Sequence, residues 1–206
     1  MIIKWFGLSC IQIKSQNRIV VIDPFSDKSG LKMPSLRADI VAVTNESAEK
    51  NLNQVKKRKK SELFVIDGAG EYEVKQVLVK GIYTKNDRLI YNIYSEGISF
   101  AHLGLIKQKE LTNKQLEDLN NVDILAVPVG NKDAIDYQKA VDIIQQIEPR
   151  MVIPIYYQTK GLKKDLDKVD KFLEEEGIKD LTPEEELKIS KAKLPSEKTE
   201  IVQLKP

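Results

Sequence analysis

The 206-residue sequence contains one cysteine, one histidine and no long hydrophobic run. A single cysteine, Cys10, cannot form an intramolecular disulfide, and this fits a reducing compartment. No apolar stretch approaches the ~18 residues of a membrane-spanning helix, and the first residues lack the basic and apolar regions of a signal peptide. We therefore expect a cytoplasmic protein with no membrane partner.

The chain also has little net charge, since 33 basic residues nearly balance 31 acidic residues and leave +2. This balance provides no overall field that would favour nucleic acid. The one basic run, Lys56–Lys60, could contact phosphate groups. It has no neighbouring aromatic residues on which bases could stack, and such runs are typically solvated helix ends. We keep nucleic-acid binding only as a minor alternative.

The scarcity of histidine restricts metal chemistry most strongly. Catalytic zinc sites use at least one histidine and commonly two or three. Here the only one is His102. A dinuclear zinc hydrolase is therefore hard to build from this composition.

Short β-branched and apolar runs, separated by turn residues, predict strands throughout the first half of the chain. They are Ile2–Phe6, Ile11–Lys14, Arg18–Ile22, Ile40–Val43, Leu63–Ile66, Gln76–Tyr83, Arg88–Tyr94 and Ile98–His102. The second half alternates between helices and strands. Its predicted helices are Thr112–Leu119, Ala134–Ile147 and Leu162–Leu173, and its predicted strands are Ile124–Val127, Met151–Ile155, Leu187–Ile189 and Glu200–Leu204. The pattern indicates one domain over residues 1–206, with two sheets and helices outside them.

Seven segments, in order along the chain, resemble motifs of the small metallo-β-lactamase-fold hydrolases. They are Trp5–Cys10 (W-F-G-L-S-C), Ile19–Phe25 (I-V-V-I-D-P-F), Ala38–Asn51 (A-D-I-V-A-V-T-N-E-S-A-E-K-N), Gly68–Val74 (G-A-G-E-Y-E-V), His102–Leu105 (H-L-G-L), Val122–Gly130 (V-D-I-L-A-V-P-V-G) and Ile153–Tyr157 (I-P-I-Y-Y). The resemblance implies an α/β fold, a four-layer αββα sandwich with metals at one edge of two sheets. It also implies a family that uses zinc.

The family's metal-binding positions carry other residues in this sequence. The H-x-H-x-D-H motif of the family corresponds to Asn45, Ser47, Glu49 and Lys50. The bridging aspartate corresponds to Leu105, the histidine of the P-M-H-Y motif to Tyr156, and a histidine near the site to Leu8. We therefore expect no metal ligands and no cofactor.

A non-catalytic protein that acts by binding or assembly is the function these replacements favour, although they leave catalysis open. Its partner, a second copy or another protein, is not specified. We expect Lys50 to approach a carboxylate, with Glu49 as the candidate, and the larger side chains to fill the former metal volume.

Two alternatives remain beside this reading. One is a metal-independent hydrolase built from residues at the vacated site, with candidates His102, Glu49, Ser47 and Tyr156. In it, His102 would act as general base, whereas packing against the backbone is the ordinary role of a lone histidine. The other is the nucleic-acid-binding relative that uses the basic run.

Overall fold

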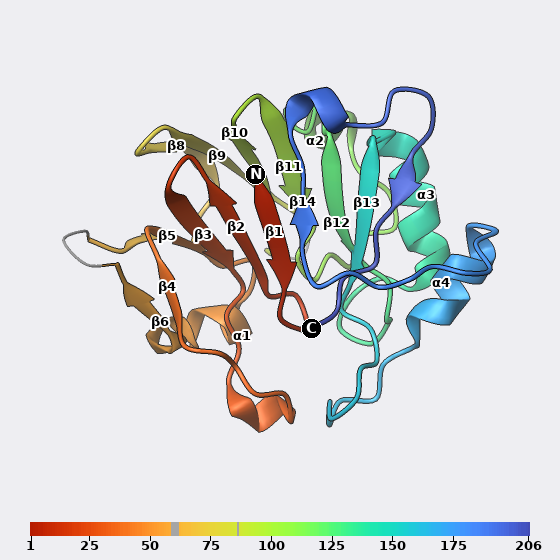
Figure 1. Cartoon of the computed structure of the whole chain (residues 1–206), viewed down its shortest axis with the longest axis horizontal. Coiled ribbons are helices and arrows are strands. Elements are labelled where there is room, and N and C mark those ends of the chain that lie inside the picture. The colour runs from red at the N-terminus through yellow and green to blue at the C-terminus, as the bar shows by residue number, and fades with distance from the viewer. Residues whose placement is uncertain (59–61, 86) are drawn as a thin grey trace.

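The computed structural model describes residues 1–58, 62–85 and 87–206 (Figure 1). One large sheet has the strand order β14-β1-β2-β3-β5-β7. Its strands are β1 (Ile2–Trp5), β2 (Ile11–Ser15), β3 (Arg18–Ile22), β5 (Ile40–Ala42), β7 (Phe64–Ile66) and β14 (Leu187–Lys188). β3, β5 and β7 run parallel to one another, so their carboxyl ends lie at the same edge.

The second large sheet has the strand order β15-β13-β12-β11-β10-β9-β8. Its strands are β8 (Gly70–Val74), β9 (Val77–Tyr83), β10 (Leu89–Ser95), β11 (Ile98–His102), β12 (Ile124–Pro128), β13 (Met151–Ile155) and β15 (Glu200–Ile201). Here β11, β12 and β13 are parallel neighbours. Consecutive carboxyl ends therefore meet along one edge of this sheet as well.

The core lies between the two sheets, where alternate side chains of each are buried. Trp5 of the first sheet stacks on Tyr157, with ring centroids 4.6 Å apart. Tyr91 of the second sheet donates a hydrogen bond to the carbonyl oxygen of Val43, across the interface. These contacts fix one sheet against the other, and with them the edge where their strand ends meet.

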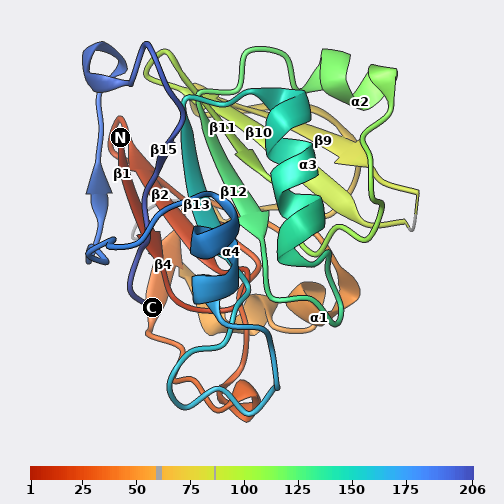
Figure 2. The same ribbon diagram turned by 90° about the vertical axis from the view of Figure 1, so that its right-hand side faces the viewer.

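Helices α3 (Tyr137–Ile147) and α4 (Val169–Glu175) cover the outer face of the second sheet (Figure 2), and α2 (Asn113–Asp118) lies near β9. The layer outside the first sheet is built from short elements instead. These are a parallel pair, β4 (Leu36–Ala38) and β6 (Val55–Lys57), and the single-turn helix α1 (Glu46–Glu49). A second apolar cluster, which includes Cys10, Phe25 and Ala48, packs beneath them.

The predicted α/β class with two sheets is confirmed. The predicted strand Glu200–Leu204 is shortened to β15, Glu200–Ile201, and three further predicted elements differ. The helix predicted from Leu162 begins only at Val169, because the preceding segment folds back onto the amide of Gln158, whose Oε1 accepts from the Leu166 N–H. Helix α3 begins at Tyr137, because the Asp136 side chain caps it by accepting from the Lys139 N–H.

The third difference lies in the basic run. Lys56 and Lys57 belong to strand β6, not to a helix end, and Lys59 and Lys60 lie outside the described residues. None of the helices in the described ranges combines the length and the apolar character that a bilayer crossing requires.

Candidate functional site

The candidate site lies where the carboxyl ends of β3, β5, β11 and β13 converge. Asp23 follows β3, Thr44 and Asn45 follow β5, and Tyr156 follows β13. β11 ends at His102. Loops and side chains at this edge form the site, because parallel strands of α/β sheets present their carboxyl ends together.

Asp23 forms the buried polar floor of the site. Its carboxylate accepts hydrogen bonds from the Thr44 N–H at 2.7 Å and the Thr44 hydroxyl at 2.6 Å, with the Asn45 amide at 3.5 Å. Burial raises the pKa of Asp23, while His102 and the bonds from Thr44 act in the opposite direction. The carboxyl group is therefore committed to donors within the protein.

His102 is fully buried beside this floor, and both of its ring nitrogens bind backbone groups. Nδ1 accepts from the Gly104 N–H at 3.0 Å, so Nε2 carries the proton and donates to the Ser9 carbonyl oxygen at 2.9 Å. Burial lowers the pKa of His102, although Asp23 partly offsets this effect. Its imidazole is therefore neutral, packed and engaged at both nitrogens.

A close backbone approach holds this histidine over the end of β5. Gly104 has φ +56°, and a Cβ there would lie 2.5 Å from the Thr44 side chain. Only glycine allows this contact without displacement. The turn after β11 therefore packs directly against Thr44, which donates hydrogen bonds to Asp23.

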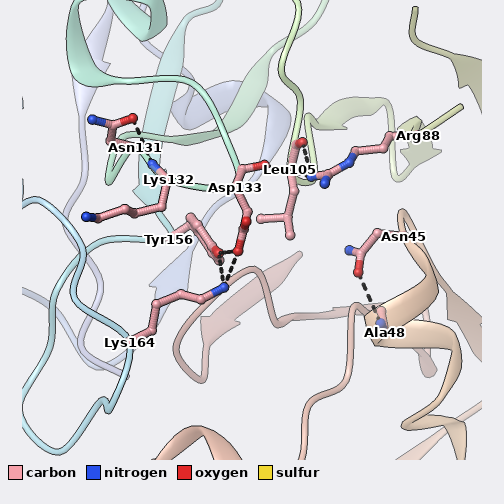
Figure 3. A network of polar contacts seen from close by, with 9 residues as sticks. All are labelled: Asn45, Ala48, Arg88, Leu105, Asn131, Lys132, Asp133, Tyr156 and Lys164. Carbon is pink, nitrogen blue, oxygen red and sulfur yellow. Dashed lines mark hydrogen bonds and ion pairs between the residues drawn. The ribbon is translucent and has the colours of Figure 1, made fainter. Parts of the chain in front are cut away.

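The replaced H-x-H-x-D-H segment forms the cap and first turn of α1. Asn45 caps the helix, and its Oδ1 accepts from the Ala48 N–H at 3.1 Å (Figure 3). Ser47, Glu49 and Lys50 are exposed. The segment that would hold metal in the family therefore serves here as a capped helix start.

The expected ion pair between Lys50 and Glu49 is wrong. Lys50 approaches Glu46 at 3.7 Å instead, and both side chains are more than three-quarters exposed. Helical spacing explains this, since residues four apart share a face and adjacent residues do not. Glu49 faces solvent, so it does not need a partner within the site.

Tyr156 belongs to a polar triad with Asp133 and Lys164, and the three side chains meet in Figure 3. The Tyr156 hydroxyl donates to Asp133 Oδ2 at 3.1 Å, and Lys164 Nζ lies 3.0 Å from the same hydroxyl. Lys164 also forms an ion pair with Asp133 and lowers the pKa of that carboxyl. Burial raises the pKa of Tyr156, so its hydroxyl remains protonated at neutral pH.

Leu105, which the sequence comparison aligned with the family's bridging aspartate, places an apolar side chain at the site. Its backbone carbonyl accepts from Arg88 at 2.6 Å, and the same guanidinium nitrogen donates to the Asp133 carbonyl at 2.7 Å (Figure 3). Arg88 thereby ties the loop after β11 to the loop that carries the triad.

An open pocket of about 420 Å³ lies among these residues. Its lining joins α1, the turn after β3, the loop at 28–29 and the loop after β13: Leu8, Ser9, Asp23, Pro24, Phe25, Lys28, Ser29, Asn45, Ser47, Ala48, Asn51, Leu105, Tyr156, Leu162, Lys163 and Lys164. We refer to it as the site pocket. We expected the larger side chains to fill the former metal volume, but an open pocket lies among Asn45, Leu105 and Tyr156 instead.

The predicted site residues divide between this pocket and its surroundings. Asn45, Ser47, Leu105 and Tyr156 line it together, whereas Glu49, Lys50 and His102 do not. Four further charged residues in or beside the pocket lie in loops without a recognisable motif and were not predicted. They are Lys28, Asp133, Lys163 and Lys164. For the pocket floor, the sequence pattern that indicated its residues was the I-D-P-F turn, which contains Asp23 and Phe25.

A metallo-β-lactamase-type sandwich with a pocket at its strand ends defines the class of protein. The profile of the β-lactamase superfamily domain matches residues 2–156, and the chain belongs to this superfamily. Among curated relatives, a UPF0173 protein of Pyrococcus abyssi is 26% identical over 185 residues, which cover 78% of this chain and 85% of the relative. A UPF0173 metal-dependent hydrolase of Lysinibacillus sphaericus is 22% identical, with 77% and 86% covered.

A solved structure extends this relationship over the whole chain. A protein of Thermotoga maritima, described as a candidate Zn-dependent hydrolase of the metallo-β-lactamase superfamily, is 29% identical. It superposes with a TM-score of 0.83 and covers 99% of this chain and 100% of its own. The metallohydrolase of Ignicoccus hospitalis shares the fold at 16% identity, with a TM-score of 0.64 and coverage of 92% and 99%.

These relatives contradict our expectation that the protein has no cofactor. The Lysinibacillus sphaericus relative is named as a metal-dependent hydrolase and the Thermotoga maritima protein is described as a candidate Zn-dependent hydrolase, and these names point to a metal cofactor. The expectation rested on the single histidine and on the replaced ligand positions.

The donor atoms of this chain do not match that metal. Within residues 1–58, 62–85 and 87–206, no three His, Cys, Asp or Glu side chains come together in a group that could hold a metal ion. In the site pocket, Asp23 is the only such side chain, and Thr44 already engages both of its oxygens. The family's cofactor and the donor set of this chain therefore disagree.

Proposed function

We propose that this chain is a non-catalytic member of its superfamily that binds a small organic molecule in the site pocket. The open pocket at the strand ends carries the proposal. Its volume of about 420 Å³ falls within the range of small-molecule sites. Of the two roles expected from the sequence, binding and assembly, the pocket favours binding.

The side chains around the pocket support binding over hydrolysis. A general base must have a free lone pair within reach of the proton it removes. Both nitrogens of His102 are occupied by backbone groups, and the Asp23 carboxylate is held by Thr44. Tyr156 is protonated and donates to Asp133. In this arrangement none of His102, Asp23 and Tyr156 is poised to activate a water molecule.

A hydrolysis assay tests the proposal. The protein is incubated in turn with Zn²⁺, Mn²⁺ and Fe²⁺ and then assayed on chromogenic esters, a phosphodiester and a β-lactam. We expect rates equal to those of the metal-containing buffer with any of the ions. A saturable rate that falls in Tyr156→Phe and is retained in Lys193→Gln, an exposed lysine outside the pocket, would overturn the proposal.

A further inference from the structure

Two lysines are brought to the mouth of the site pocket by a fixed contact between loops. The Lys163 N–H donates to the Ser29 carbonyl oxygen at 2.9 Å. Gly30, with φ +93°, lies so close to the other loop that a Cβ would be 2.3 Å from the Gly161 carbonyl oxygen. The loops that carry Lys28 and Lys163 are therefore held together, and both side chains line the pocket.

The ammonium groups of these two lysines have no partner among the residues that the structure describes. Across the described ranges, neither Lys28 nor Lys163 forms an ion pair or a side-chain hydrogen bond. Lys164, the third lysine of the lining, is already neutralised by Asp133. The mouth of the pocket therefore carries positive charge that the protein itself does not balance.

Between its polar floor and its mouth, the same pocket has a largely apolar wall. Phe25, Leu105 and Leu162 are buried and face it, whereas Lys28 and Lys163 are exposed at its mouth. The one carboxylate of the lining, Asp23, lies at the buried end, where it would repel a second anion. The arrangement separates an apolar wall from a cationic mouth.

Given that the pocket binds a small molecule, as proposed above, we infer that its ligand is an organic anion with an apolar body. The apolar body lies against Phe25, Leu105 and Leu162, and its anionic group, a carboxylate or a phosphate, lies between Lys28 and Lys163. Burial of apolar area provides the main attraction, and the ammonium groups select the sign of the charge.

A matched set of probes of one chain length tests this inference by calorimetry. Octanoate and octyl phosphate carry the anion, octan-1-ol is neutral and octylamine is a cation, while acetate has the anion without the apolar body. We expect the two anions to bind with one-to-one stoichiometry and roughly tenfold more tightly than octan-1-ol, with no measurable binding of octylamine or acetate. The ratio of octanoate to octyl phosphate identifies the preferred anionic group.

Two double variants separate the pocket lysines from other lysines. Lys28→Gln with Lys163→Gln should weaken octanoate binding roughly tenfold and leave the affinity for octan-1-ol unchanged. The control, Lys14→Gln with Lys193→Gln, removes the same charge from exposed positions outside the lining and should leave both affinities unchanged. Melting temperatures of the variants verify that each is folded.

The outcomes distinguish the ligand class from the binding function. Equal affinity for octanoate and octan-1-ol would overturn the organic-anion inference and leave the proposed binding function standing. An equal loss of octanoate affinity in both double variants would also overturn it, because a general charge effect would then suffice. Absence of binding by every probe would overturn the inference too, while the hydrolysis assay decides the proposed function independently.

Discussion

The polar groups at the buried floor of the site pocket are hydrogen-bonded within the protein, whereas the charged groups at its exposed mouth are not paired within the described residues. At the floor Asp23 accepts hydrogen bonds from Thr44, and His102, packed beside the floor, binds backbone groups with both ring nitrogens. At the mouth, Lys28 and Lys163 form no ion pair with any residue that the structure describes. Buried polar groups must be satisfied internally, whereas exposed charges can remain available. We therefore expect the hydrogen-bonded residues of the floor to stabilise the fold and the lysines of the mouth to select the ligand.

Removing the floor carboxylate should have the largest effect. Asp23→Ala leaves the Thr44 N–H and hydroxyl without their acceptor in a buried position, and we expect a loss of ~2–4 kcal/mol in the free energy of unfolding. At the mouth, Lys28→Gln should change it by less than ~0.5 kcal/mol. Urea denaturation of the two variants measures both values. Similar losses in the two would erase the distinction between floor and mouth.

Acidification should destabilise the floor through His102. Because burial lowers the pKa of this histidine in the folded state, its contribution to stability is present above the unfolded value of ~6.5. That contribution is lost as the pH falls through the folded pKa. We expect a lower free energy of unfolding at pH 5.5 than at pH 7.5, and a weaker dependence in His102→Gln.

Asp23 opposes this trend and provides the control. Its folded pKa is raised, so its contribution is full below the unfolded value of ~3.9 and is lost as the pH rises through the folded pKa. Asp23→Asn removes this opposing contribution and should therefore steepen the loss of stability on acidification. A flat profile in both the native protein and this variant would show that His102 is not held neutral.

Blocking the pocket should affect ligand binding without affecting the fold. Ser47 is exposed and lines the pocket, so the indole of Ser47→Trp can enter the space that a ligand needs. We expect octanoate affinity to fall by more than about tenfold, while the melting temperature stays within a few degrees. Glu49→Trp, on the same helix but outside the lining, is the matched control and should bind normally. Equal binding by the two variants would locate the ligand elsewhere.

The basic run should have the smallest effect, since we propose no nucleic-acid function for it. Arg58 pairs with the buried carboxylate of Asp39, so it is committed to the fold. Lys56→Gln with Lys57→Gln should leave fluorescence anisotropy of labelled single-stranded RNA and DNA at background at about 150 mM salt. Submicromolar binding by the native protein that disappears in this double variant would contradict the prediction.

Local pattern and family motifs were sufficient to predict most strands and the sandwich class. The predicted strands Arg18–Ile22 and Ile98–His102 agree with the structure, because short β-branched runs between turn residues strongly favour strands over helices. The capping box from Thr112 to Gln115 likewise fixes the start of α2. The failures lie where tertiary hydrogen bonds override helical spacing, as in the segment from Leu162 to Lys168.

The site was predicted only in part, for a similar reason. Alignment to the family motifs placed Asn45, Leu105 and Tyr156 at positions that the structure brings to one pocket. It did not indicate Lys28 and Lys163, which are 135 residues apart and line one pocket because their loops touch at Gly30. No local pattern specifies such a contact. Nor did the motifs show whether the space between them would be filled or open.

A crystal structure of the protein with octanoate tests the central claim most directly. We expect the octyl chain to lie against Phe25, Leu105 and Leu162, with carboxylate oxygens about 2.7–2.9 Å from the ammonium groups of Lys28 and Lys163. Octanoate bound with its carboxylate toward Asp23, or bound only outside the site pocket, would contradict it.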